Sequence, residues 1–296
     1  MARTISLSGR EWRICGMLPH EWVWKSVWDK PFEAYPAYWI PAEVPGSVQL
    51  DLMEAGVIPD WTRDLDSRAC EWTSYRDWVH VREFDTPEMA AGETAWLRLD
   101  GVDWLGHVYL NGQKLGEAEG MWIAREWDVT GLLRQGEPNL LVVVVEHAPE
   151  HEGQIGWTDR VRHWKPRFAY DWDWCTRLIP LGIFGDVGLI VRQGAWIEDV
   201  WARPQVAADL RRADLPVVVS LRAACAGEAR VEVVLEREGR TVARGEQAVS
   251  LRPGAARVEM ALAVDSPALW RPNRGAEAVQ PLYLCRVRVS DGRDEL

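Results

Sequence analysis

Apolar and polar residues alternate through the C-terminal third of the chain, with the period of two that is typical of half-buried β-strands. The segments that share this alternation are residues 215–225, 229–236, 240–250, 256–264 and 281–290. Turn-forming pairs separate them at Glu238-Gly239 and Pro253-Gly254. Short strands spaced in this way predict an antiparallel β-sandwich.

The first two thirds of the chain also contain short β-rich segments bounded by Gly, Asn or Asp. They are residues 95–100, 106–111, 139–146 and 186–192. Asn111-Gly112 is a strong signal for a two-residue hairpin, and the apolar run 140–145 suits a buried strand. Helical evidence is confined to residues 48–55, where Ser47 is the expected cap. We therefore expect an all-β chain of two sandwiches, the first with long loops.

Composition places the boundary between these regions. Residues 195–296 contain equal numbers of acidic and basic residues, so the whole net charge of −11 lies in the first 194 residues. Sixteen of the 19 tryptophans lie at or before Trp174. These shifts meet near Gln193-Gly194 and predict domains at residues 1–194 and 195–296. The negative first region would repel phosphate backbones, which argues against a nucleic-acid partner.

The cysteines and histidines favour neither a disulfide framework nor a metal site. The five cysteines are scattered without zinc-ligand spacing, and the close pair His147 and His151 is typical of a solvated loop. No apolar run reaches membrane-spanning length, and the first 16 residues lack the apolar core of a signal peptide. We expect a cytoplasmic protein with reduced thiols and with no metal, cofactor or membrane partner.

The densest candidate chemistry lies in AYDWDWCTRLIPLGIFGDVGL, residues 169–189. Asp173 stands between Trp172 and Trp174, and such a group suits a sugar site. Indole faces stack on the C–H side of a pyranose ring, and a carboxylate accepts hydrogen bonds from its hydroxyls. The alternative is a Trp-rich corner of the core in which the Asp caps a turn.

Three long stretches without strand signals, residues 17–45, 60–78 and 149–185, carry many of the remaining tryptophans. Long loops in compact domains are often functional, so indoles on them suggest a binding rim. The alternative is that the loops fold over the edge of a sandwich and the indoles supply core volume. We expect most of them to do so and a minority to line a sugar site.

Several sequence blocks in a fixed order resemble the N-terminal half of glycoside hydrolase family 2, with the nearest similarity to β-mannosidases. The blocks are VPGSVQLDLMEAGVIPD (44–60), DWVHVREFD (77–85), LRLDGVDWLGHVYLNGQKLGE (97–117), EWDVTGLLRQGEPNLLVVV (126–144), YDWDWCTRLIPLGIFGDV (170–187) and LWRPN…QPLY (269–283). The resemblance covers essentially the whole chain. It implies a jelly-roll, galactose-binding-like sandwich followed by an immunoglobulin-like β-sandwich. In the family, a (β/α)₈ barrel that carries both catalytic carboxylates follows these domains.

The resemblance also implies a role for the Trp-Asp-Trp group. In β-mannosidases the matching loop reaches over the barrel mouth, so Asp173 would contact hydroxyls of the terminal sugar while Trp172 and Trp174 orient it. The chain departs from the family pattern where Cys175 replaces a Gly and where Phe184 replaces a Trp. A Gly that allowed positive φ would leave Cys175 with an altered turn or with strain.

No catalytic residue is expected in these 296 residues. Retaining glycosidases need two carboxyl groups about 5 Å apart, and neither the family's Asn-Glu pair nor a matching nucleophile is found. Asp171 and Asp173 are close in sequence, but acidic loop residues are usually solvated. We expect the chain to lack the catalytic barrel and to be inactive alone.

Three functions remain open. The first is the non-catalytic N-terminal part of a β-mannosidase-like retaining glycosidase, with a terminal β-mannoside and the catalytic barrel of the parent chain as partners. The second is a stand-alone carbohydrate-binding module, and the third is a purely structural pair of domains. The exact sugar is also open, since β-galactosidases, β-glucuronidases and exo-glucosaminidases share both sandwiches.

Overall fold

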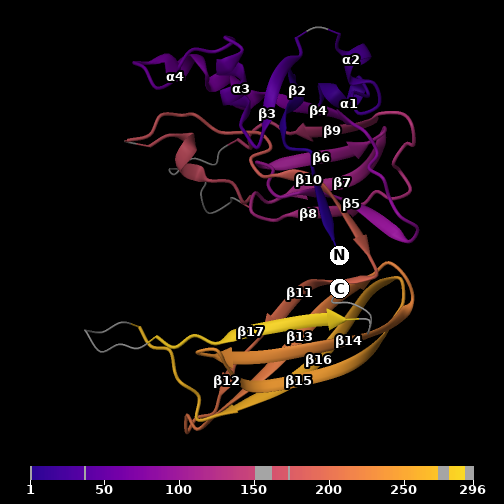
Figure 1. Ribbon diagram of the computed structural model, residues 1–296. Coiled ribbons are helices and arrows are strands. Elements are labelled where there is room, and N and C mark those ends of the chain that lie inside the picture. The colour runs from indigo at the N-terminus through magenta and orange to yellow at the C-terminus, as the bar shows by residue number, and fades with distance from the viewer. Residues whose placement is uncertain (1, 37, 151–161, 173, 273–279, 291–296) are drawn as a thin grey trace. The chain divides into compact units, whose positions relative to one another are not determined.

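The computed structural model describes residues 2–36, 38–150, 162–172, 174–272 and 280–290 (Figure 1). The chain divides into two compact units. One consists of Thr4–Glu88 and Ala95–Val191, and the other of Arg192–Leu296 together with Met1–Arg3 and Met89–Thr94. Each unit is built from two β-sheets, which confirms the all-β prediction of a jelly-roll sandwich followed by an immunoglobulin-like sandwich.

The first unit contains a six-stranded and a four-stranded sheet. The larger has the order β3-β2-β4-β9-β6-β7 and the smaller β1-β10-β5-β8. The strands are β1 (Arg3–Ser6), β2 (Gly9–Met17), β3 (Ile40–Val44), β4 (Asp77–Phe84), β5 (Glu93–Leu99), β6 (Leu105–Leu110), β7 (Gln113–Glu119), β8 (Arg125–Asp128), β9 (Asn139–Val145) and β10 (Val187–Gln193). The hairpin predicted at Asn111-Gly112 joins β6 to β7, with Leu110 paired to Gln113.

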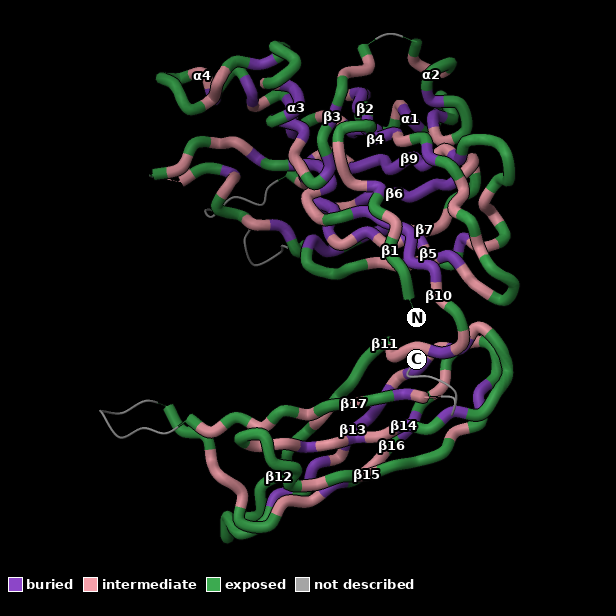
Figure 2. Tube along the Cα trace, viewed as in Figure 1, coloured by how far each residue is buried: buried purple, intermediate pink, exposed green. Residues whose placement is uncertain are grey.

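The core of this unit is centred on β9, which runs between β4 and β6. Its apolar run is buried on both faces, as the sequence predicts, and Figure 2 shows the buried residues gathered along β9 and β6. One face is covered by the segment that follows β2. There the Trp28 ring stacks on Tyr109 with centroids 5.4 Å apart, and Trp22 is buried beside them.

The predicted helix α3 (Val48–Glu54) is present, and its cap is confirmed because the Ser47 hydroxyl accepts a hydrogen bond from the Leu50 amide. The other helices among the described residues are single turns too short to leave a periodic signal. They are α1 (Glu21–Trp24), α2 (Pro31–Ala34), α4 (Asp66–Ala69) and the 3₁₀ turns η1 (Glu71–Tyr75) and η3 (Arg167–Tyr170). Among the described residues, no helix is long and apolar enough to cross a membrane.

The prediction that Trp78 lies on a loop, within residues 60–78, is wrong. Trp78 lies in β4, is 2% exposed, and donates its indole N–H to the carbonyl of Thr73. Asp77 and His80 share this strand and are buried as well, so polar residues interrupt the apolar pattern by which a buried strand is recognised. The other loop tryptophans differ in exposure: Trp22 is buried, whereas Trp24 is 82% exposed.

The second unit is an antiparallel sandwich whose two sheets contribute alternate residues to one core. One sheet contains β11 (Ala195–Ala202), β12 (Gln205–Val206), β13 (Arg212–Ala223) and β16 (Gly254–Asp265), and the other β14 (Gly227–Arg237), β15 (Arg240–Leu251) and β17 (Leu284–Ser290). Val217, Val219, Val231 and Val233 are fully buried between them. The turn predicted at Glu238-Gly239 joins β14 to β15, and both residues have positive φ.

Candidate functional site

The candidate sugar loop consists of residues 162–183, of which 162–172 and 174–183 are described. Asp173 lies outside the described residues, so its position stays a prediction. Trp172 and Trp174 approach edge-to-face with ring centroids 5.6 Å apart, and Trp174 is 77% exposed. The backbones of Trp172 and Cys175 exchange two hydrogen bonds of 3.3 and 3.2 Å. A tight turn therefore presents an exposed indole at the tip of the sugar loop.

Cys175 does not carry the strain that its replacement of a Gly suggested. Within the described part of this turn, the positive φ lies at Asp171 (126°) and not at Cys175. Asp171 has φ 126° and ψ 137°, outside the left-handed region that Asp tolerates, so the backbone strain of this turn falls on Asp171.

The limb that returns from the tip is embedded in the first unit. Ile179, Leu181 and Ile183 are each 1% exposed. The Val48 amide donates to the Leu181 carbonyl and the Gly46 amide to the Ile183 carbonyl, both at 2.9 Å. The start of α3 therefore holds this limb by backbone hydrogen bonds as well as by burial.

Two positions at and just beyond the end of the sugar loop, Gly182 and Gly185, require glycine for steric reasons. Gly182 has φ of +139°, and a Cβ there would lie 3.2 Å from the Cα of Ser47. A Cβ on Gly185 would lie 2.4 Å from the backbone nitrogen of Gly101. Only glycine lets the chain approach these neighbours so closely.

A buried ion pair lies at the base of the sugar loop. The Lys165 ammonium donates to Asp103 Oδ1 at 2.6 Å and to the Pro180 carbonyl at 2.7 Å. The Lys165 side chain is 0% exposed and that of Asp103 4%. Burial raises the pKa of the Asp103 carboxyl, although the Lys165 charge acts against this rise. Sequence reasoning missed Lys165, because a single lysine in an irregular segment gives no signal of burial.

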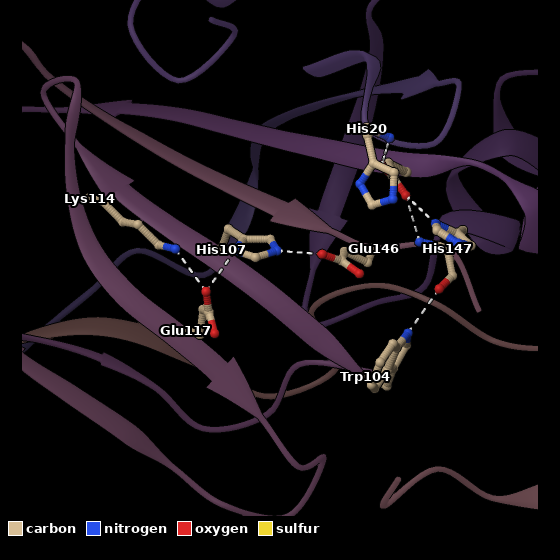
Figure 3. Close-up of polar contacts among 8 residues, drawn as sticks. His20, Trp104, His107, Lys114, Glu117, Glu146 and His147 are labelled. Atoms are coloured by element: carbon tan, nitrogen blue, oxygen red, sulfur yellow. Dashed lines mark hydrogen bonds and ion pairs between the residues drawn. The ribbon is translucent and has the colours of Figure 1, made fainter. Parts of the chain in front are cut away.

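Trp104, the residue after Asp103, connects the sugar loop to the segment that follows β9. Its indole N–H donates to the His147 carbonyl at 2.9 Å, and its ring meets His163 edge-on with centroids 4.5 Å apart (Figure 3 shows Trp104 and His147). Trp104 is 8% exposed. Its role is therefore structural.

His147 itself pairs with Asp77, whose side chain is completely buried. The distance from His147 Nδ1 to Asp77 Oδ1 is 2.7 Å, and the same carboxylate accepts from the amides of His20 and His147, the two residues of this group that Figure 3 labels. Burial opposes ionisation of Asp77, but these hydrogen bonds outweigh it and lower the pKa of the carboxyl. The hydrogen bond to Asp77 raises the pKa of His147. His147 is thus an anchored, partly buried side chain rather than part of a solvated loop.

A second polar chain crosses the hairpin strands. His107 Nε2 lies 2.6 Å from a Glu146 oxygen and His107 Nδ1 lies 3.3 Å from Glu117, which also accepts from Lys114 at 2.7 Å (Figure 3). The hydrogen bond from Lys114 lowers the pKa of Glu117. Each carboxylate already faces a cation or an imidazole, so this chain stabilises the hairpin.

No metal centre is found in the part of the chain that the structure describes, since no three His, Cys, Asp or Glu side chains there are grouped to hold an ion. His151 lies outside that part. All five cysteines are free.

Two family models match the chain, in the same order as its two sandwiches. Residues 22–185 match the glycosyl hydrolase 2 galactose-binding domain-like model, and residues 195–296 match the model for glycosyl hydrolases family 2. The chain belongs to glycosyl hydrolase family 2. This confirms the resemblance found in the sequence blocks.

Similar proteins within glycosyl hydrolase family 2 include β-mannosidases. β-Mannosidase B of Thermothelomyces thermophilus is 28% identical, over 96% of this chain and 33% of its own length. The crystal structure of β-D-mannosidase from Dictyoglomus thermophilum is 26% identical with a TM-score of 0.76, and the match covers 99% of this chain and 35% of that one. A β-glucuronidase of Bacteroides uniformis is only 16% identical at a TM-score of 0.67, which shows the shared fold alone. The chain spans about a third of the length of these relatives.

Proposed function

We propose that this chain is the N-terminal, non-catalytic part of a β-mannosidase-like retaining glycoside hydrolase that removes terminal β-linked mannose. The observation that carries the proposal is similarity to β-mannosidases along nearly the whole chain, over only a third of their length. The second family model starts at residue 195.

The chemistry would be divided between this segment and a catalytic domain. A retaining glycosidase uses one carboxyl group as nucleophile and a second as acid and base, about 5 Å apart. Both would come from the barrel, so the 296 residues alone would cleave no glycoside. This segment would contribute the sugar loop, where Asp173 accepts hydrogen bonds from hydroxyls of the terminal sugar while Trp172 and Trp174 orient it.

One observation favours a second candidate, a carbohydrate-binding module that acts without chemistry. Trp174 is 77% exposed, and a solvent-facing indole offers a stacking surface for a pyranose ring. We still rank it second, because one exposed ring buries little area and predicts weak binding by the chain alone. A related β-glycosidase specificity is the third reading, since these enzymes share both sandwiches.

The deciding experiment is hydrolysis of a panel of aryl β-glycosides by the full-length protein, with the 296-residue segment as the blank. We expect the β-mannoside to be cleaved with the highest kcat/KM and the segment to be inactive. Preference for a galactoside, glucuronide or glucosaminide would replace the mannosidase assignment. Calorimetric titration of the segment with mannosides tests the module, because submillimolar affinity would favour it.

A matched pair of variants tests the loop carboxylate. Asp173→Asn in the full-length protein should lower kcat/KM by about 10- to 100-fold, since a charged hydrogen bond to the sugar is lost. Asp171→Asn is the control, because Asp171 is exposed and Asn has the same size and branching, so the substitution removes the charge and leaves the backbone preference nearly unchanged. Equal effects of the two substitutions would remove Asp173 from the pocket.

A further inference from the structure

The sugar loop has two limbs, an outgoing limb (residues 162–172) and a return limb (residues 174–183), and they are held in different ways. The return limb contributes Ile179, Leu181 and Ile183 to the core and pairs by backbone with the segment before α3. The Gln49 side chain, itself 2% exposed, adds a 2.7 Å hydrogen bond to the Ile179 carbonyl. This limb is therefore as firmly fixed as a core strand.

The outgoing limb lies mostly at the surface. Of its described residues, 162–172, Lys165 and Tyr170 are buried, whereas Trp164 is 77% and Phe168 61% exposed. Exposed side chains contribute little to holding a segment in place. Lys165 and Tyr170 are thus the described residues by which this limb reaches the interior of the first unit.

Lys165 makes side-chain contacts that join the two limbs, in addition to the 3.1 Å backbone hydrogen bond from the Leu178 amide to the Ala169 carbonyl. Its ammonium reaches Asp103 on one side and the Pro180 carbonyl of the return limb on the other, at 2.6 and 2.7 Å. Asp103 is in turn paired with Gly182 through two backbone hydrogen bonds of 2.9 and 3.2 Å. One side chain therefore fastens the outgoing limb to the return limb and to the segment before β6.

A buried ion pair suits this task better than an apolar contact. Burial of a lysine and an aspartate is costly in free energy, and an apolar pair of similar volume often stabilises a fold as well. An ammonium directed at two oxygens, however, is satisfied only at one position of the limb. The pair thus specifies where the limb lies, which an apolar residue would do less well.

We propose that Lys165, with Asp103 as its partner, is a positioning residue that fixes the Trp172–Trp174 turn for sugar binding. The sugar part of this inference rests on the proposed function, whereas the positioning part does not. Lys165 touches no sugar in this scheme and acts through the turn.

Thiol labelling of the chain tests the positioning directly. Cys175 is half-buried within the turn, Cys15 and Cys70 are buried elsewhere in the first unit, and Cys225 is exposed in the second. In Lys165→Met we expect Cys175 to react with iodoacetamide about tenfold faster or more, because the limb opens locally. Cys15 and Cys70 should stay protected, and the rate at Cys225 should not change.

Two further variants make the outcome decisive. Arg177→Met is the matched control, because Arg177 connects the return limb to η1, through a 3.2 Å hydrogen bond to Ser74 and a contact 4.9 Å above the Tyr75 ring, and we expect no change at Cys175. The double variant Lys165→Met with Asp103→Asn removes both charges and so avoids an unpaired carboxylate in the core; it should also speed the labelling of Cys175. An unchanged rate at Cys175 in both Lys165 variants overturns the proposal. Equal exposure of Cys15 and Cys70 in the double variant overturns it too, since the pair would then support the whole unit.

Kinetics of the full-length enzyme test the link to the sugar. Lys165→Met should raise KM for an aryl β-mannoside about tenfold and leave kcat nearly unchanged, as expected when a contact made equally in ground and transition states is lost. An unchanged KM together with fast labelling of Cys175 would overturn the link to sugar binding. If the parent protein cleaves no glycoside, the proposed function fails, and the labelling still decides the role of Lys165.

Discussion

The imidazole Nδ1 of His147 lies 2.7 Å from a carboxylate oxygen of Asp77, and no part of the Asp77 side chain is exposed. The amides of His20 and His147 donate to the same carboxylate at 2.7 and 2.8 Å. Asp77 begins β4, His20 precedes α1 and His147 follows β9. One carboxylate therefore ties three segments that are distant in the sequence.

This pair predicts a loss of stability at alkaline pH that depends on His147. The pKa of His147 is raised above its ordinary 6.5, so its contribution is complete below pH 6.5 and is lost as the pH rises through the raised value. The pKa of Asp77 is lowered below 3.8, so its contribution is present above pH 3.8 and is lost only in stronger acid.

His147→Gln should therefore cost about 1 kcal/mol in the free energy of unfolding at pH 5.5 and less at pH 8.5. Urea denaturation of the wild-type chain and the variant at both pH values measures the difference. The same deficit at both values would show that the charge on His147 contributes nothing.

His80 predicts a pH dependence of the opposite sign. It lies in the middle of β4, opposite Ile14 of β2 and Val143 of β9, and is 2% exposed. Burial lowers its pKa from 6.5 to about 4. The unfolded chain therefore takes up a proton that the folded chain excludes, and stability falls as the pH drops from 6.5 towards 4, by on the order of 3 kcal/mol.

His80→Leu removes this group and should flatten the fall in stability between pH 6.5 and 4. The slope of unfolding free energy against pH is the readout, because the substitution also changes packing. Wild-type and variant slopes that coincide in this range would contradict the assignment of His80 as a buried neutral imidazole.

How far the sequence predicts this structure depends on how local each signal is. Alternation revealed β13–β16 because each strand turns one face towards the core, and Ser47 was recognised as a cap because its partner Leu50 is three residues away. β4 was missed because Asp77 and His80 interrupt its apolar run. Their partners, like the Asp103 partner of Lys165 that lies 62 residues away, come from other segments. No local pattern encodes such contacts.

The close approach of Gly185 to Gly101 predicts a large effect of a single methyl group. A Cβ at residue 185 would lie 2.4 Å from the Gly101 nitrogen and 2.7 Å from the Asp100 carbonyl carbon, and backbone atoms cannot move aside cheaply. Gly185→Ala should lower the free energy of unfolding by about 2 kcal/mol or more. Gly131→Ala is the control, because a Cβ there meets no atom within 4 Å. Thermal unfolding of both variants measures the contrast, and equal midpoints would contradict the steric account.

Substitution of Trp174 distinguishes sugar stacking from core packing at the tip of the sugar loop. Trp174 is 77% exposed, so Trp174→Ala should change the free energy of unfolding by less than about 1 kcal/mol. If the indole stacks on the terminal sugar, the same variant of the full-length protein should show KM for an aryl β-mannoside raised about tenfold. Trp24→Ala is the matched control, because Trp24 is 82% exposed and lies in α1, outside the sugar loop. A Trp174→Ala enzyme with unchanged KM would leave the exposed ring without a role in sugar binding.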